Sequence, residues 1–289
     1  GIWSSAVINS NSPRLLDDTM VLGLMDYARY GQLTIITPFC LSGAMAPITV
    51  EGALVLSHAE ALAGITLSQM TNPGAPIAYG SFSSNVDMKS GSPAFGTPEH
   101  VRLQIGAGQL ARLIGIPWRA AAGSASNASD AQGAAENLMG LWGAVMAGAN
   151  IILHSVGWLE GGLTVGYEKT ITDLEQIQSI AELCLPGEDT DLAAVFADIA
   201  SVAPGGHFFD TDATMARFAE AFYPPLVADL SNHGAWQEAG GLTAEERATA
   251  IWQDHLRAYQ RPEKSLEIEE RLMPLVDKMK RAGGAAPLT

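Results

Sequence analysis

Short apolar segments recur along the first half of this chain, and each is followed by a longer segment with helical signals. They cover residues 33–37, 76–82, 117–122 and 151–153. Their starts lie roughly 33 to 43 residues apart, the usual length of a strand–loop–helix unit in a parallel sheet. With residues 6–9 as a further strand, they predict an α/β fold of the (β/α)8 TIM-barrel type. A closed barrel needs eight such units and commonly about 250 residues, so five strands predict an incomplete barrel, the C-terminal part of a larger one.

The segments between the apolar runs carry helix starts and stops, and helices are expected over residues 14–30, 49–69, 97–115 and 131–147. Thr49 can cap its helix, and Thr97 is followed by Pro98, a residue favoured in the first helical turn. After Lys169 no strand is expected, and helices are predicted over about 171–185, 191–202, 212–223, 244–260 and 265–281. The chain is therefore divided into a barrel portion, 1–203, and a helical C-terminal extension packed on it, 204–289.

Charge and cysteine content exclude several classes of protein. A net charge of −15 and a pI near 4.7 argue against a nucleic-acid surface, which needs clustered Lys and Arg. Cys40 and Cys184 are too few and too far apart for a disulfide framework. No apolar run is expected to be long enough to cross a membrane, and the start at Gly1 shows no signal-peptide pattern. These features predict a cytoplasmic protein without a membrane partner, and unpaired histidine spacing predicts no bound metal.

The candidate active site follows the apolar run at residues 151–153, where His154, Trp158 and Glu160 come within a glycine-rich stretch. In α/β proteins such residues lie at the carboxyl ends of strands, where active sites form. His154 and Glu160 are the candidate catalytic residues. Each also has a structural alternative: His154 as a hydrogen-bonded core histidine, Glu160 as a helix cap or loop anchor, and Trp158 as core packing.

Further candidates for substrate binding follow the earlier strands. Tyr79, Phe82 and Ser83 end one strand, and Ser124 and Asn127 lie in the loop 123–130 after the next. Asp87 lies in the long loop 83–96, which is either a lid over the site or a solvated loop; loops of that length are usually functional.

Several short motifs together resemble the trimethylamine methyltransferase family. They are spread in the same order from the first residues to about Trp252. They comprise Asn-Ser-Asn-Ser-Pro at 9–13, Tyr-Gly-Ser-Phe-Ser-Ser at 79–84, Asp-Ala-Gln at 130–132, Gly-Ala-Asn at 148–150, His154, Gly-Trp-Leu-Glu-Gly-Gly-Leu at 157–163, Tyr-Glu at 167–168 and Pro-Gly-Gly-His-Phe at 204–208. The resemblance implies a β/α barrel that moves a methyl group from a methylated amine to the cobalt of a corrinoid carried by a separate protein. Full-length members of this family extend well upstream of Gly1.

The resemblance also implies a substrate class. Some members carry pyrrolysine in the barrel, but this sequence has only standard residues, so it resembles the non-pyrrolysine branch, for which quaternary amines such as glycine betaine are expected. The loop 123–130 is the expected place of the substituted position. A quaternary ammonium has no N–H group and is held by aromatic faces and charge, at roughly 0.5 to 2 kcal/mol per ring. Tyr79, Phe82 and Trp158 are the expected aromatic cage.

Two other interpretations stay open at this point. One is a barrel lyase or aldolase acting on a small carboxylated metabolite, with His154 and Glu160 as acid and base. The other is a non-catalytic domain, because a truncated barrel lacks strands. The unfinished sheet edges also predict a homo-oligomer.

Overall fold

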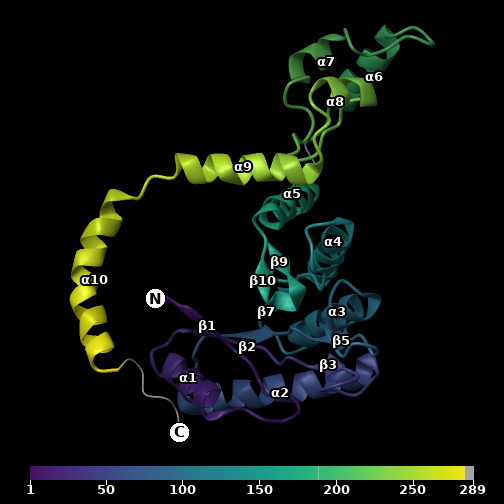
Figure 1. The fold of residues 1–289 in the computed structure, drawn as a ribbon. Coiled ribbons are helices and arrows are strands. Elements are labelled where there is room, and N and C mark those ends of the chain that lie inside the picture. The colour runs from purple at the N-terminus through teal and green to yellow at the C-terminus, as the bar shows by residue number, and fades with distance from the viewer. Residues whose placement is uncertain (188, 284–289) are drawn as a thin grey trace.

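A computed structural model describes residues 1–187 and 189–283. Its centre is a curled, entirely parallel sheet in which the strands lie in the order β1-β2-β4-β7-β8 (Figure 1). The strands are β1 (Ser5–Ile8), β2 (Leu33–Ile36), β4 (Ile77–Gly80), β7 (Trp118–Ala121) and β8 (Ile151–Leu153). They are the five strands predicted from the sequence, within a residue or two at most ends. The molecule is thus a mixed α/β protein with half of a barrel, and no closed barrel is present in the described residues.

Each strand of this sheet leads to a helix that returns the chain along its outer side (Figure 1). The helices are α1 (Asp18–Arg29), α2 (Val50–Thr71), α3 (Pro98–Leu113), α4 (Ala131–Met146) and α5 (Tyr167–Leu183). The predicted caps are confirmed: Thr49 Oγ1 accepts from Gly52 N at 3.1 Å and Thr97 Oγ1 from His100 N at 3.2 Å. Asp130 caps α4 by accepting from Gly133 N at 3.0 Å.

The core lies between the sheet and these helices, and it fixes which way the strand side chains point. Tyr79, Trp118 and Ala120 pack against small residues of α2, α3 and α4. Because successive side chains of a strand point to opposite faces, Arg119 and Ala121 lie on the concave, inner face of the sheet. Alignment of the strands, with Gly80 beside Arg119 and Ala121 beside Leu153, places the carboxyl ends of β4, β7 and β8 together.

Several short elements were not expected from the sequence. The loop 83–96 contains β5 (Ser84–Val86) and β6 (Pro93–Ala94), which form a small sheet with β3 (Leu41–Ser42). A second small sheet pairs β9 (Trp158–Leu159) with β10 (Thr164–Val165) around the short 3-10 helix η1 (Glu160–Gly162). Helix α8 (His233–Glu238) was also missed. Strands of two or three residues are too short to show an alternating pattern in sequence.

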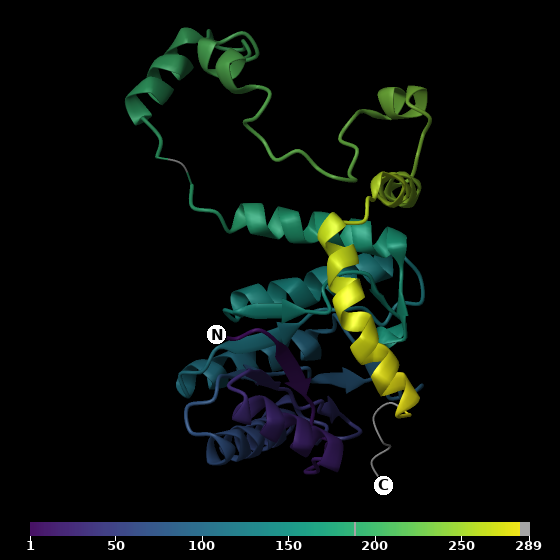
Figure 2. The same cartoon turned by 90° about the vertical axis from the view of Figure 1, so that its left-hand side faces the viewer.

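The C-terminal region is helical, as predicted, and no strand follows β10 in the described part of the chain. It comprises α6 (Leu192–Ser201), α7 (Asp212–Arg217), α8, α9 (Ala244–Ala258) and α10 (Glu263–Arg281). Helix α9 packs on α5 through Ile171 and Ala248. Helices α6 and α7 lie together beyond α5 and away from the sheet, α8 lies apart from them, and α10 extends separately (Figures 1 and 2). The domain division at residue 203 stays a prediction.

One helix contradicts an expectation from the sequence. Helix α2 is long and apolar enough to cross a membrane by length and composition alone, although no such segment was expected. It also carries the buried Glu60, whose carboxylate accepts hydrogen bonds from Ser12 Oγ and Arg14 N, each at 2.6 Å. These contacts, together with its packing between α1 and α3, are those of a helix in the core of the half-barrel. Core helices can be as long and as apolar as a membrane-spanning helix.

Candidate active site

Aromatic rings from several strand ends meet at one place on the sheet. Phe39 follows β2, Phe82 follows β4 and His154 follows β8. Phe82 lies at the centre, with ring centroids 5.2 Å from Phe39, 5.2 Å from Phe95 and 5.0 Å from His154. Trp158 joins from β9, 5.7 Å from Phe82 and 4.4 Å from His154. We call Phe39, Phe82, Phe95, His154 and Trp158 the aromatic cluster; all except Phe95 are only partly buried.

The position of Trp158 depends on two glycines and a buried ion pair. Gly123 lies against the indole, where an added Cβ would be 3.1 Å from Cδ1, and a Cβ at Gly162 would overlap the ring. Gly157, which precedes Trp158, donates its backbone N–H to Asp173 at 2.9 Å. Asp173 forms an ion pair with Lys169, and both side chains are almost fully buried. The loop that carries the indole is therefore anchored from α5.

His154 has a backbone conformation that is unusual for a core histidine. Its φ of +59° lies in the left-handed region, which is costly for a non-glycine residue and is often found at functional sites. Burial, and to a lesser extent the charge of Arg119, lowers the pKa of His154 to about 4. The imidazole is therefore neutral at pH 7, and it adds an aromatic face to the cluster without a positive charge.

Arg119 is the functional candidate that sequence reasoning missed. It lies in the middle of β7 on the inner face and is fully buried, and no residue in the described part of the chain accepts a hydrogen bond from its Nε, Nη1 or Nη2. Its guanidinium carbon lies 5.7 Å from the centroid of the Phe82 ring. Burial lowers the pKa of Arg119 to about 10, so the side chain stays charged at neutral pH. The signal in the sequence was an arginine inside an otherwise apolar strand.

The structure brings His154, Trp158 and Phe82 together but places the other candidates elsewhere. Tyr79 lies on the outer face of the sheet, where its hydroxyl is 3.2 Å from His58 Nδ1, and burial raises its pKa. Ser124 donates to Glu136 at 2.8 Å in the loop beside Trp158. Ser83 is buried, and its hydroxyl has no hydrogen-bond partner within the described ranges 1–187 and 189–283. Glu160, Asn127 and Asp87 are exposed.

Two of those exposed residues have clear local roles. Glu160 begins η1 with a φ of +54°, and its N–H donates to Ser126 O at 2.8 Å, so its backbone joins the loop 123–130 to the loop that carries Trp158. Asp87 closes the turn between β5 and β6 by accepting from Ser90 Oγ at 2.7 Å and Ser90 N at 3.0 Å. These bonds, led by the Ser90 hydroxyl, lower the pKa of Asp87.

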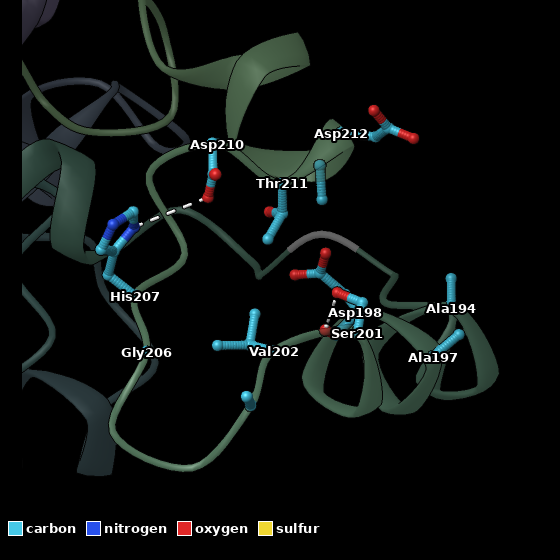
Figure 3. A pocket seen from close by; sticks show the side chains of 12 residues that line it. Ala194, Ala197, Asp198, Ser201, Val202, Gly206, His207, Asp210, Thr211 and Asp212 are labelled. Atoms are coloured by element: carbon cyan, nitrogen blue, oxygen red, sulfur yellow. Dashed lines mark hydrogen bonds and ion pairs between the residues drawn. The ribbon is translucent and has the colours of Figure 1, made fainter.

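The described residues offer no group of three or more His, Cys, Asp or Glu side chains that could hold a metal ion. A pocket of about 800 Å³ lies far from the aromatic cluster, between α6 and α7 (Figure 3). Its wall includes His207, which is exposed and pairs with Asp210 at 3.5 Å. The pocket consists mostly of small and acidic side chains on a segment that stands apart from the sheet, so it is not our candidate site.

Acidification is expected to destabilise the fold through its buried histidines. Burial lowers the pKa of His100, which packs against Phe95 of the cluster, to about 4 from an ordinary 6.5. Below pH 6.5 the unfolded chain binds a proton that the folded chain does not. Stability therefore falls as pH drops from 6.5 towards 4, by about 3 kcal/mol in total for this group. Urea unfolding at pH 7 and 4.5 should show a smaller loss for His100→Gln than for the wild type, and equal losses would contradict this assignment.

Comparison with known proteins agrees with the motifs. Residues 3–284 match the model of the family described as trimethylamine methyltransferase (MTTB). Over 273 residues the chain is 37% identical to a glycine betaine methyltransferase of Desulfitobacterium hafniense, covering 94% of this chain and 57% of that protein. It is 31% identical to trimethylamine methyltransferase MttB2 of Methanosarcina mazei, covering 88% of this chain and 51% of that protein. The chain thus spans about half the length of the curated relatives it matches.

Proposed function

The chain belongs to the trimethylamine methyltransferase family, and we propose that it takes part in transferring a methyl group from a quaternary amine such as glycine betaine to the cobalt of a corrinoid on a separate protein. The observation that carries this proposal is the aromatic cluster at the carboxyl ends of β2, β4 and β8. Active sites of β/α barrels lie at that end of the sheet. The absence of pyrrolysine and the 37% identity to a glycine betaine methyltransferase support a quaternary substrate.

The cluster suits a quaternary ammonium. Such a cation has no N–H group, so it is attracted mainly to the faces of aromatic rings and to negative charge. Phe39, Phe82 and Trp158 supply ring faces that are only partly buried. His154 lies within the same cluster and is neutral because burial lowers its pKa to about 4. A protonated imidazole at this position would repel the substrate.

The proposed reaction is an in-line displacement. The electron pair of cobalt(I) forms a bond to the methyl carbon while the carbon–nitrogen bond breaks and its electrons stay on nitrogen. A quaternary ammonium leaves as a neutral tertiary amine, so no general acid is required. The residues of this chain would hold the ammonium with one methyl group facing the acceptor and keep water away from the reacting atoms.

A lyase or aldolase mechanism has less support from the geometry. His154 and Glu160 would have to act as a pair, but the Glu160 side chain is exposed and no hydrogen bond or ion pair joins the two within residues 1–187. A histidine with a pKa near 4 is also a weak base at neutral pH. No observation favours this alternative over methyl transfer.

The test is methyl transfer to cob(I)alamin, followed by the absorbance change as methylcobalamin forms. Purified protein is incubated with glycine betaine, tetramethylammonium or trimethylamine, and cob(II)alamin without reductant serves as the control acceptor. We expect transfer from a quaternary amine only when cobalt is reduced. Absence of transfer from every amine, with the free cofactor and with a reduced corrinoid protein, would refute the proposal.

A further inference from the structure

The inner face of the half-barrel contains a buried positive charge that pairs with no carboxylate of residues 1–187 or 189–283. Arg119 is fully buried, and none of its three guanidinium nitrogens has a hydrogen-bond partner among the described residues. Phe82 contacts the guanidinium, and the charge of Arg119 contributes to lowering the pKa of the neighbouring, neutral His154. A contact with one ring does not replace the acceptors that five N–H groups require.

A second donor without a partner lies in the same cluster. The indole Nε1 of Trp158 is buried and finds no acceptor among the residues that the structure describes, and the Trp158 ring contacts Phe82 at a centroid distance of 5.7 Å. Phe82 therefore contacts both side chains. Buried polar groups are normally hydrogen-bonded, and a buried charge is normally paired. Both groups are donors, so an anion with oxygen acceptors is the kind of ligand that would satisfy them.

We propose that Arg119 binds the carboxylate of a small-molecule substrate while the aromatic rings hold its ammonium group. The inference rests on the proposed function for the ammonium half of the ligand, and it adds the group that recognises the other half. A guanidinium is suited to a carboxylate because two parallel N–H groups match its two oxygens. The site would therefore select zwitterions that carry both charges over simple methylated amines.

The charge of Arg119 explains why the site would favour a zwitterion over a simple quaternary cation. A bare quaternary cation placed on Phe82 or Trp158 would be repelled by Arg119 across a buried, weakly screened site. A ligand carboxylate between the two cations removes that repulsion and supplies the missing acceptors. Phe82 contacts the guanidinium and is itself only partly buried, so the side of Arg119 that faces Phe82 is where we expect the carboxylate to approach.

The test compares ligands that share one charge with glycine betaine. Isothermal titration calorimetry is carried out without cobalamin, using glycine betaine, tetramethylammonium and 3,3-dimethylbutanoate, the uncharged-head isostere that keeps the carboxylate. The variants are Arg119→Met and Arg119→Lys. The matched control is Arg102→Met, because Arg102 is an exposed arginine of α3 that pairs with Glu99.

We expect Arg119→Met to weaken binding of glycine betaine and of 3,3-dimethylbutanoate about 10- to 100-fold, as for loss of a hydrogen-bonded charge. Binding of tetramethylammonium should stay equal or improve, and Arg119→Lys should restore part of the affinity for the two carboxylates. Arg102→Met should bind all three ligands like the wild type. Without ligand, Arg119→Met should melt at the same or a higher temperature, since it removes an unpaired buried charge.

Equal effects on all three ligands, or none on any, would overturn the assignment of Arg119. A lower melting temperature with unchanged ligand discrimination would also overturn it and would identify a structural role. Failure of methyl transfer together with carboxylate-dependent binding would refute the proposed reaction and leave the assignment of Arg119 intact. The two proposals therefore fail in different experiments.

Discussion

Replacing Asp173 with alanine is expected to lower the free energy of unfolding by about 3 to 5 kcal/mol, the usual cost of removing one partner of a buried ion pair. Asp173 is fully buried, is paired with Lys169 and accepts the N–H of Gly157 at 2.9 Å. The substitution leaves a buried ammonium and a buried N–H without partners. Burial raises the pKa of Asp173 although Lys169 opposes the rise, so the pair depends on its close geometry. Urea denaturation followed by circular dichroism measures the change.

Two further variants make this result specific. Asp26→Ala removes an exposed partner of Arg29 on α1 and should cost less than about 1 kcal/mol. Lys169→Met combined with Asp173→Leu removes both charges and should recover much of the stability lost in Asp173→Ala. If Asp173→Ala were no more destabilising than Asp26→Ala, the ion pair would not anchor the loop that carries Trp158.

Replacing Trp158 with alanine is expected to reduce kcat/KM for methyl transfer from a quaternary amine roughly 30-fold. A desolvated cation–π contact contributes about 2 kcal/mol, and each 1.4 kcal/mol corresponds to about a tenfold change. The indole lies 4.4 Å from His154 and 5.7 Å from Phe82 by ring centroids, so its loss also opens the cluster to water. Initial rates with cob(I)alamin as acceptor give the measurement.

Three control variants distinguish the loss of the Trp158 aromatic face from a nonspecific loss of structure. Trp158→Phe keeps an aromatic face and should retain more activity than Trp158→Ala. Trp3→Ala removes an indole that is 89% exposed and should leave kcat/KM unchanged. Gly162→Ala keeps the tryptophan but forces it to move, because its Cβ would overlap the indole, and we expect it to resemble Trp158→Ala. If kcat/KM were unchanged in Trp158→Ala, the indole would have no part in binding the substrate, and the prediction would be wrong.

Most of the fold was predictable because its signals are local. Each strand of the sheet is a short apolar run, and the helix starts are fixed by capping side chains such as Thr49, Thr97 and Asp130. The sequence also indicated His154 and Trp158, since both follow a buried strand at a glycine-rich turn. What it missed were the short strands of the two small sheets, such as β3 and β9, which have too few residues to show a pattern of their own.

The sequence by itself therefore determined the order of strands and helices and its resemblance to the methyltransferase family, because periodicity, capping and motifs are written in consecutive residues. Only the tertiary structure decided which of the candidate residues meet. Tyr79 and Phe82 are three residues apart in sequence, yet Tyr79 faces the helices while Phe82 contacts Arg119 and Trp158. The unpaired charge of Arg119 could be recognised only there, because whether a donor has an acceptor depends on every segment folded around it.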